Sequence, residues 1–270
     1  MGRAAIAADV LDSLVFDDEY ALLGDLVFRL PGAFPEQERA RPGLDLYKDP
    51  GLIEEYSDLW RARGHFDADR ILELGTWHGG SAALWTECFR PAKYVGVDLV
   101  ARGRSEYFDA YRKRRALGDR LSTHWGIDQS DRSALLGVVE SEFAGSLDLI
   151  IDDASHRYEH TRASFEALFP LLRPGGLYVI EDWAWGHWAH PSADDDPRLV
   201  AAVYPPEYDG QPRLSCLIRE LVLLAGSTWL FREVSVRQGI VAVERSETPA
   251  ILDGRRFDLA ELLRERARPD

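Results

Sequence analysis

From about residue 70 onward, hydrophobic residues fall into short continuous runs separated by longer amphipathic segments. The runs include RILELG, YVGVDL, LDLIID and LYVIED, and segments such as SAALWTECF and TRASFEALFPLL lie between them. Strands that are apolar along their whole length, rather than at alternate positions, are typical of a parallel sheet with both faces covered. The pattern therefore predicts an α/β fold in which strands and helices alternate along the chain.

The pattern changes on both sides of this region. Residues 1–65 carry apolar stretches interrupted by prolines, such as AADVLDSLVF and EYALLGDLVFRL, and these predict a helical N-terminal cap. Residues 66–245 form the predicted core domain, which ends in the hairpin-like stretch STWLFREVSVRQGIVAVERS. Within it, residues 183–210 are polar and rich in tryptophan, as expected of a substrate loop. Residues 246–270 predict a charged C-terminal extension with one amphipathic helix.

Composition narrows the class of ligand. The 46 acidic and 32 basic residues give a formal net charge of −14, which disfavours nucleic acid because phosphate binding depends on Lys and Arg. Acidic residues interrupt the apolar start of the chain, so we expect neither a signal peptide nor a transmembrane helix. Cys88 and Cys216 show no disulfide or metal-binding spacing. We therefore expect a cytoplasmic protein that acts on a small molecule, and homo-oligomerisation stays open.

A glycine-rich turn, ELGTWHGGS, joins the first strand of the core to a helix. Glycines at such a turn let a ligand approach the backbone, and the first N–H groups of the helix can bind it. Asp98 ends the next strand, where a carboxylate can accept hydrogen bonds from ribose hydroxyls. The turn by itself is equally compatible with a tight connection, but together with Asp98 it indicates an adenosine-containing ligand. The candidate residues of the turn are Glu73, Gly75, Thr76, Gly79 and Ser81.

These features resemble the class I S-adenosylmethionine-dependent methyltransferases over residues 70–245. The resemblance implies a Rossmann-like sheet of seven mostly parallel strands that ends in an antiparallel hairpin. It also implies that the glycine turn binds the methionine and ribose parts of S-adenosylmethionine, with Asp98 on the ribose. Asp128 and Gln129, after the third strand, fall where this family holds the adenine, although the neighbouring Ser130–Asp131 is equally well explained as a helix N-cap.

Carboxylates also mark the ends of two later strands, LDLIIDD and LYVIED. Neighbouring parallel strands lie about 4.8 Å apart, so acids at their C-terminal ends can converge on one ion. Asp153, Glu181 and Asp182 would then form an all-oxygen cluster suited to Mg²⁺, Ca²⁺ or Mn²⁺; otherwise they are ordinary polar strand ends. Because successive strand side chains point to opposite faces, Asp152 is expected to have a different, structural partner.

The stretch IIDDASHRYEHTRASFEALFPLLRPGGLYVIEDW is more specific. Its D-D-x-S-H, R-P-G-G and Y-V-I-E-D elements are similar to the metal-dependent sugar O-methyltransferases of antibiotic biosynthesis (the mycinamicin, elloramycin and calicheamicin tailoring type) and their cephalosporin hydroxylase-like relatives. The resemblance implies that Asp153, Glu181 and Asp182 bind Mg²⁺, that Asp153 also contacts the cofactor, and that His156 is the general base. It implies methylation of a sugar hydroxyl, for example of a deoxysugar such as rhamnose, on a glycosylated natural product.

The aromatic loop after the last acidic strand end supplies candidates for substrate contact. These are Trp183, Trp185 and His187, together with Tyr56, which precedes the cofactor turn at a distance where related enzymes close over the ligand. Tyr47 is a candidate for the same reason.

Two other functions stay open. The first is a hydroxylase-like oxygenase, although the usual non-haem iron site has two histidines and one carboxylate. The second is a non-catalytic partner that binds S-adenosylmethionine, although such a protein has no need of a base such as His156.

Overall fold

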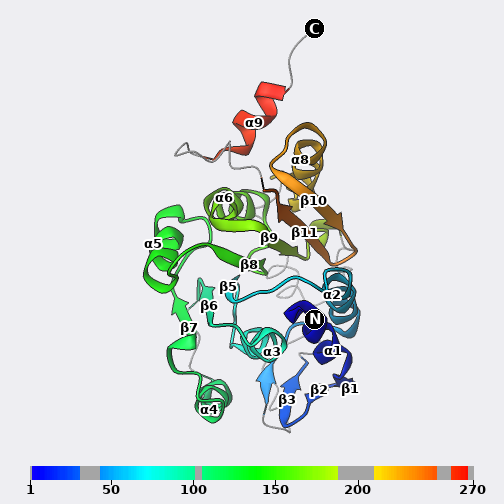
Figure 1. The fold of residues 1–270 in the computed structure, drawn as a ribbon, viewed down its shortest axis with the longest axis vertical. Coiled ribbons are helices and arrows are strands. Elements are labelled where there is room, and N and C mark those ends of the chain that lie inside the picture. Colours follow the sequence, from blue (N-terminus) through cyan, green and yellow to red (C-terminus); the bar gives the residue numbers. More distant parts are fainter. Residues whose placement is uncertain (1, 31–42, 101–104, 188–209, 248–256, 267–270) are drawn as a thin grey trace.

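The computed structural model describes residues 2–30, 43–100, 105–187, 210–247 and 257–266. The strands of its large sheet are β5 (Arg70–Leu74), β6 (Lys93–Asp98), β7 (Leu121–Trp125), β8 (Leu147–Asp152), β9 (Leu172–Glu181), β10 (Phe231–Val236) and β11 (Ile240–Arg245). They lie in the order β10-β11-β9-β8-β5-β6-β7, and β5 to β9 pair in parallel. β11 runs antiparallel to both β9 and β10. The predicted Rossmann-like sheet with its terminal hairpin is therefore confirmed (Figure 1).

Helices cover both faces of this sheet (Figure 1). They are α1 (Arg3–Asp12), α2 (Pro50–Ala62), α3 (Gly80–Phe89), α4 (Glu106–Arg114), α5 (Arg132–Glu142), α6 (Tyr158–Leu168), α8 (Leu214–Ser227) and α9 (Leu259–Arg266), with 3₁₀ turns at Gly118–Arg120, Phe169–Leu171 and Trp185–His187. Successive strand residues alternate between two hydrophobic clusters. Ile71 packs with α1 to α4, whereas Leu72 packs with α5, α6, α8 and α9. Burial on both faces accounts for the continuous apolar runs.

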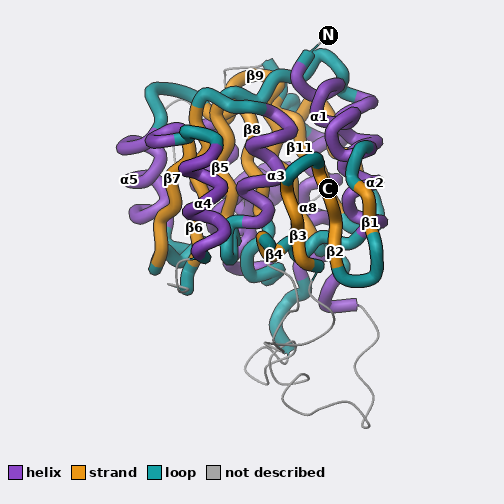
Figure 2. Tube along the Cα trace, turned by 90° about the horizontal axis from the view of Figure 1, so that it is seen from below, coloured by secondary structure: helices purple, strands orange, loops and turns teal. Residues whose placement is uncertain are grey.

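The N-terminal region is mixed rather than wholly helical, so the helix predicted over EYALLGDLVFRL is wrong. This stretch forms a hairpin of β2 (Tyr20–Leu23) and β3 (Leu26–Arg29), whose two-residue turn has Gly24 at a φ of 57°. Glycine in this position is typical of tight hairpins. Alternate residues of β3, Leu26 and Phe28, are buried in the core. With β1 (Val15–Phe16) and β4 (Leu44–Asp45), the hairpin makes a small sheet beside α1 and α2 (Figure 2).

The C-terminal extension packs onto the core through the face of α9. Leu259 and Leu262 are buried, and the Phe257 ring lies 5.8 Å from that of Phe169. The remainder of the extension at 248–256 and 267–270, and most of the predicted substrate loop, at 188–209, fall outside the described residues. Among the helices that are described, none combines the length and apolar character that a membrane crossing needs.

The strand order places a binding crevice at the C-terminal edge of the sheet. The chain runs from β5 outward to β6 and β7 on one side and to β8 and β9 on the other. Where a parallel sheet reverses its strand order in this way, the loops after the strands separate and leave room for a ligand. The glycine turn follows β5, and the acidic residues follow β8 and β9, so the fold brings both predicted features to this crevice.

Candidate active site

A cavity of about 510 Å³ opens at this edge of the sheet. Five of the residues predicted to contact the cofactor line it, namely Gly75, Asp98, Asp128, Gln129 and Asp153. The other four, Glu73, Thr76, Gly79 and Ser81, do not line the cavity but lie in or beside the turn that forms its wall. Tyr47 also lines it, half-exposed, with its ring 4.9 Å from that of Trp77.

The carboxylate of Asp98 is held by the turn after β5 and by the segment that follows β6. The backbone N–H of Trp77 donates to Asp98 Oδ2 at 2.8 Å, and that of Val100 donates to Oδ1 at 2.9 Å. Gly75 has a φ of 86°, and a Cβ on it would lie 1.9 Å from the carbonyl oxygen of Asp153. Only glycine therefore allows the cofactor turn to pass directly against the start of the β8–α6 loop.

Glu73 is fully buried behind this turn. Burial raises the pKa of the Glu73 carboxyl to about 7, against the opposing effects of the Lys48 ammonium and of neighbouring hydroxyl groups. Glu73 therefore does not face the cavity. Its carboxyl group takes up a proton when the chain folds near neutral pH.

We expect the variant Glu73→Gln to remove a pH dependence of stability. Between about pH 4.5 and pH 7, the folded wild type holds a proton on Glu73 that the unfolded chain releases, so its free energy of unfolding falls as the pH rises. This term amounts to up to about 3 kcal/mol. Urea unfolding of the two proteins at pH 5, 6 and 8 measures it. Parallel curves of stability against pH would contradict this role of Glu73.

Asp152 is the centre of a buried hydrogen-bond network. Gln129 Nε2 donates to Asp152 Oδ1 at 3.0 Å, and the hydroxyls of Ser164 and Tyr178 each donate to Oδ2 at 2.7 Å. The Gln129 amide oxygen accepts from the Ser155 backbone N–H at 2.8 Å. The prediction that Asp152 has structural partners is thus confirmed. Gln129, predicted to contact the adenine, also holds the loop between β8 and α6 through Ser155.

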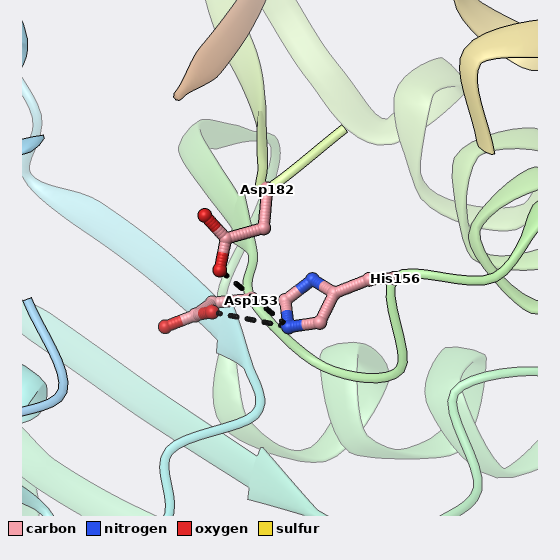
Figure 3. Close-up of side chains that lie close together, drawn as sticks. All are labelled: Asp153, His156 and Asp182. Atoms are coloured by element: carbon pink, nitrogen blue, oxygen red, sulfur yellow. Dashed lines mark ion pairs between the residues drawn. The ribbon is translucent and has the colours of Figure 1, made fainter. Parts of the chain in front are cut away.

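Asp153, His156 and Asp182 all line the cavity, and their side chains lie close together (Figure 3). His156 Nε2 is 3.9 Å from Asp153 Oδ1 and 3.9 Å from Asp182 Oδ2. His156 and Asp182 have φ values of 54° and 51°, in the left-handed region that non-glycine residues seldom adopt. Such backbone strain is concentrated at functional sites, where the surrounding fold holds it.

Beneath this cluster lies Lys48, a residue that the sequence does not single out. Its ammonium donates to Asp153 Oδ2 at 2.9 Å and to the two oxygens of Glu181 at 2.7 and 2.5 Å. The Tyr56 hydroxyl donates to Glu181 Oε1 at 2.6 Å. Glu181, predicted to bind metal, is fully buried and accepts hydrogen bonds from Lys48 and Tyr56, so Tyr56, predicted to contact substrate, faces Glu181.

The charges of these groups are strongly coupled. Burial by itself would lower the pKa of Lys48, but the carboxylates of Asp153 and Glu181 raise it, and the net direction is upward. Burial and the neighbouring Asp153 raise the pKa of Glu181 to about 6, while Lys48 opposes the rise. Burial also raises the pKa of Asp182, against the effect of His156. Gathered carboxylates of this kind are stabilised by a cation.

The cluster of Asp153, His156 and Asp182 in the cavity lining fits a divalent cation. Its two carboxylates and one imidazole offer ligand atoms that all lie within 4.8 Å of one another. Atoms on opposite sides of one ion lie about 4.2 Å apart for Mg²⁺ and about 4.6–5.2 Å apart for Ca²⁺. Asp153 and Asp182 are the residues that would hold the ion, with His156 beside them.

The predicted substrate residues of the aromatic loop lie in three different environments. Trp185 stands beside the cluster, with its ring 6.0 Å from that of His156. Trp183 Nε1 donates to the backbone oxygen of Arg237 at 2.8 Å. His187 is exposed, and its Nε2 lies 2.6 Å from Ser215 Oγ. Of the three, Trp185 is the one that the structure brings to the cluster.

Comparison with known proteins agrees with this geometry. Residues 72–183 match the family described as a methyltransferase domain. Demethylmacrocin O-methyltransferase of Streptomyces fradiae is 33% identical over 174 aligned residues, a match that covers 58% of this chain and 40% of the relative. The 8-demethyl-8-alpha-L-rhamnosyl tetracenomycin-C 2'-O-methyltransferase of Streptomyces olivaceus is 32% identical over 197 residues, which covers 63% of this chain and 48% of the relative.

A solved structure shows the same likeness. The methyltransferase MycE of the mycinamycin biosynthetic pathway, in complex with Mg and SAH, superposes with a TM-score of 0.51 and 28% identity. The superposition covers 72% of this chain and 49% of MycE, so the chain spans less than half of the length of each of these three relatives. Together with the sheet, the glycine turn and the acid cluster, these likenesses show that residues 72–183 carry a methyltransferase domain and that the chain is similar to MycE and to the two Streptomyces O-methyltransferases.

Proposed function

We propose that this protein is an S-adenosylmethionine- and Mg²⁺-dependent O-methyltransferase that methylates a sugar hydroxyl of a glycosylated natural product. The observation that carries the proposal is the cluster of Asp153, His156 and Asp182, which lines the same cavity as the glycine turn. The cluster combines carboxylates for a hard cation with an imidazole that can accept a proton. Relatives whose names include a rhamnosyl tetracenomycin and an L-olivosyl-oleandolide O-methyltransferase support the acceptor class.

In the proposed reaction, residues of this chain bind and orient the methyl donor, and one residue accepts a proton from the acceptor. Asp98 accepts hydrogen bonds from the ribose of the methyl donor, and the turn at Gly75 brings the donor close to the backbone. His156 takes the proton that the acceptor oxygen loses as it gains the methyl group, while the bond from sulfur to that methyl group breaks. Asp153 and Asp182 would hold the metal, which would supply Lewis-acid activation of the acceptor hydroxyl.

Other features support a small-molecule acceptor. The formal net charge of −14 would repel a polyanion such as nucleic acid. Trp185 beside His156 offers an aromatic face against which a sugar ring could pack. We also propose that the protein acts in the cytoplasm without a membrane partner.

The test is an assay of methyl transfer to glycosylated acceptors. The purified protein is incubated with S-adenosylmethionine and a panel of macrolides and aromatic polyketides that carry 6-deoxysugars. The masses of the products are measured by mass spectrometry. We expect a mass gain of one CH₂ group, abolished by EDTA and restored by Mg²⁺. Activity that is indifferent to EDTA would contradict the metal-dependent mechanism.

The same assay decides between methylation and the two alternatives. A hydroxylase would add one oxygen atom instead of CH₂. Within the described residues the cluster has one histidine and two carboxylates, which is the reverse of the usual non-haem iron set. A protein that binds S-adenosylhomocysteine but methylates none of the acceptors would favour the non-catalytic binding partner.

A further inference from the structure

We propose that Arg213 is a positioning residue for the acceptor. It joins the turn that carries Trp185 to the loop that carries His156, and so sets the distance between the aromatic face and the general base. The inference rests on the proposed function, because Trp185 and His156 are the residues that would meet the acceptor. Arg213 lies beyond the predicted substrate loop, in a segment that offers no catalytic or metal-binding pattern.

The backbone of Arg213 is fixed to the loop that carries His156. Arg213 forms an antiparallel β-bridge with Arg157, the residue after His156. Its carbonyl oxygen accepts from the backbone N–H of Cys216 at 2.8 Å, in the first turn of α8. Leu214, the first residue of this helix, is buried in the core. The place of Arg213 relative to His156 is therefore set by the backbone and does not depend on the arginine side chain.

The side chain of Arg213 reaches the second element of the site, the 3₁₀ turn Trp185–His187. Its Nη1 lies 2.9 Å from His187 Nδ1, and His187 Nε2 lies 2.6 Å from Ser215 Oγ. A guanidinium has only donors, so Nδ1 must accept, and the imidazole proton is then on Nε2 and is donated to Ser215. Both ring nitrogens of His187 are thus engaged at the start of α8, where they cannot serve the acceptor.

The middle residue of the turn allows this contact. The aliphatic part of the Arg213 side chain packs over Gly186, on which a Cβ would meet Cγ and Cδ of Arg213 at 3.4 and 3.5 Å. At its other side the turn is held by the strand end, because the backbone N–H of Trp185 donates to the Asp182 carbonyl oxygen at 2.8 Å. Trp185 is therefore held between Asp182 and Arg213, with its ring 6.0 Å from that of His156.

This arrangement affects acceptor binding more than the stability of the fold. A sugar ring packed on Trp185 presents a hydroxyl to His156 only while the two side chains keep their distance. A displacement of about 1 Å in a group that positions a substrate can cost up to about 100-fold in rate. The contact between Arg213 and His187 is exposed, and a single exposed hydrogen bond contributes little to folding.

The test is a double-mutant cycle between Arg213 and Trp185, measured as methyl transfer to an acceptor that the wild type methylates. Arg213→Ala should raise the acceptor KM about tenfold and lower kcat less than about threefold, because the aromatic face moves while the base stays in place. In a Trp185→Ala background, the same substitution should change KM by less than about twofold. A tenfold rise in that background would show that Arg213 acts independently of Trp185, and would overturn the inference.

The matched control is Arg219→Ala, because Arg219 is another exposed arginine of α8 and its guanidinium contacts Cys216 Sγ at 3.3 Å. This variant should keep the wild-type KM. In Arg213→Ala, the affinity for S-adenosylhomocysteine should be unchanged. So should the affinity for Mn²⁺, a spectroscopic substitute for Mg²⁺ that is measured by electron paramagnetic resonance. Loss of either affinity would indicate a general disturbance of the site and would contradict the proposed role.

His187→Ala covers the case in which Arg213→Ala does not fold. It removes the same contact from the opposite side, so it should raise KM to the same degree, and the double variant should be no worse than either single variant. In protein labelled with fluorotryptophan, the fluorine resonance of Trp185, assigned with Trp185→Phe, should shift in both single variants and not in Arg219→Ala. A Trp185 resonance that stays unchanged would overturn the inference.

The outcomes also separate this inference from the proposed function. Absence of methyl transfer by the wild type to every acceptor would overturn the proposed function and the acceptor role of Arg213 with it. Methyl transfer by the wild type, combined with an Arg213→Ala variant that behaves like Arg219→Ala, would overturn the role of Arg213 and leave the proposed function intact.

Discussion

Replacing His156 with alanine is expected to lower the rate of methyl transfer by about 10²–10⁴-fold, the usual contribution of a positioned general base. His156 Nε2 lies 3.9 Å from a carboxylate oxygen of each of the two aspartates that would hold the ion, so it is placed to accept a proton from an acceptor hydroxyl bound beside them. Removing the imidazole takes away the proton acceptor but leaves the cofactor turn and Asp98 in place. The affinity for S-adenosylhomocysteine, measured by calorimetry, should therefore change by no more than a few-fold.

A control variant and a metal-affinity measurement show whether the loss of activity is due to the loss of a general base. His124→Ala is the matched control, because His124 pairs with Glu142 at 2.6 Å on β7 and does not line the cavity. It should retain wild-type activity. Mn²⁺ affinity then separates a base from a ligand. If His156→Ala loses Mn²⁺ binding to the same degree as Asp182→Asn, His156 acts as a metal ligand and the proposed role as base is wrong.

The sequence predicted the sheet well because its signal is local. A strand buried on both faces is mostly apolar, so β5, β6, β8 and the second half of β9 each appear as a short hydrophobic run, interrupted by Glu73 in β5 and by Asp148 in β8. The end of each run locates the edge of the sheet, and the fold then brings these ends to one crevice. Asp98, Asp153 and Asp182 could be placed at one site for this reason.

The N-terminal hairpin was missed because its pattern is ambiguous. The leucines of EYALLGDLVFRL fit a helical face as well as they fit two short strands. The pair Gly24–Asp25 between two hydrophobic runs was the available signal for a hairpin turn. The consequence is functional, because β4 and the following residues carry Lys48 into the acid cluster.

The contacts of Lys48 and Glu181 could not be predicted from the residues next to them in the sequence. Lys48 is 105 residues from Asp153 and 133 residues from Glu181, so nothing in its immediate surroundings marks it. The same holds for Glu181, because its partners Lys48 and Tyr56 lie 133 and 125 residues away in the sequence.

Mutations of the adjacent residues Asp152 and Asp153 should therefore affect different properties, the first stability and the second metal binding and activity. We expect Asp152→Ala to lower the free energy of unfolding by about 2–4 kcal/mol, because it leaves the buried donors of Gln129, Ser164 and Tyr178 without their acceptor. Asp153→Asn should cost less stability, because Lys48 keeps its contacts with Glu181, but it should abolish both Mn²⁺ binding and methyl transfer.

Urea unfolding followed by circular dichroism, together with Mn²⁺ titration, measures both effects in the same preparations. Asp152→Asn serves as the matched control for Asp152→Ala, because it keeps one acceptor oxygen and should recover part of the lost stability. Equal losses of stability in Asp152→Ala and Asp153→Asn would show that both residues are structural. Weaker Mn²⁺ binding in a folded Asp152→Asn would instead assign Asp152 to the metal site, which its complete burial on the far side of β8 from Lys48 argues against.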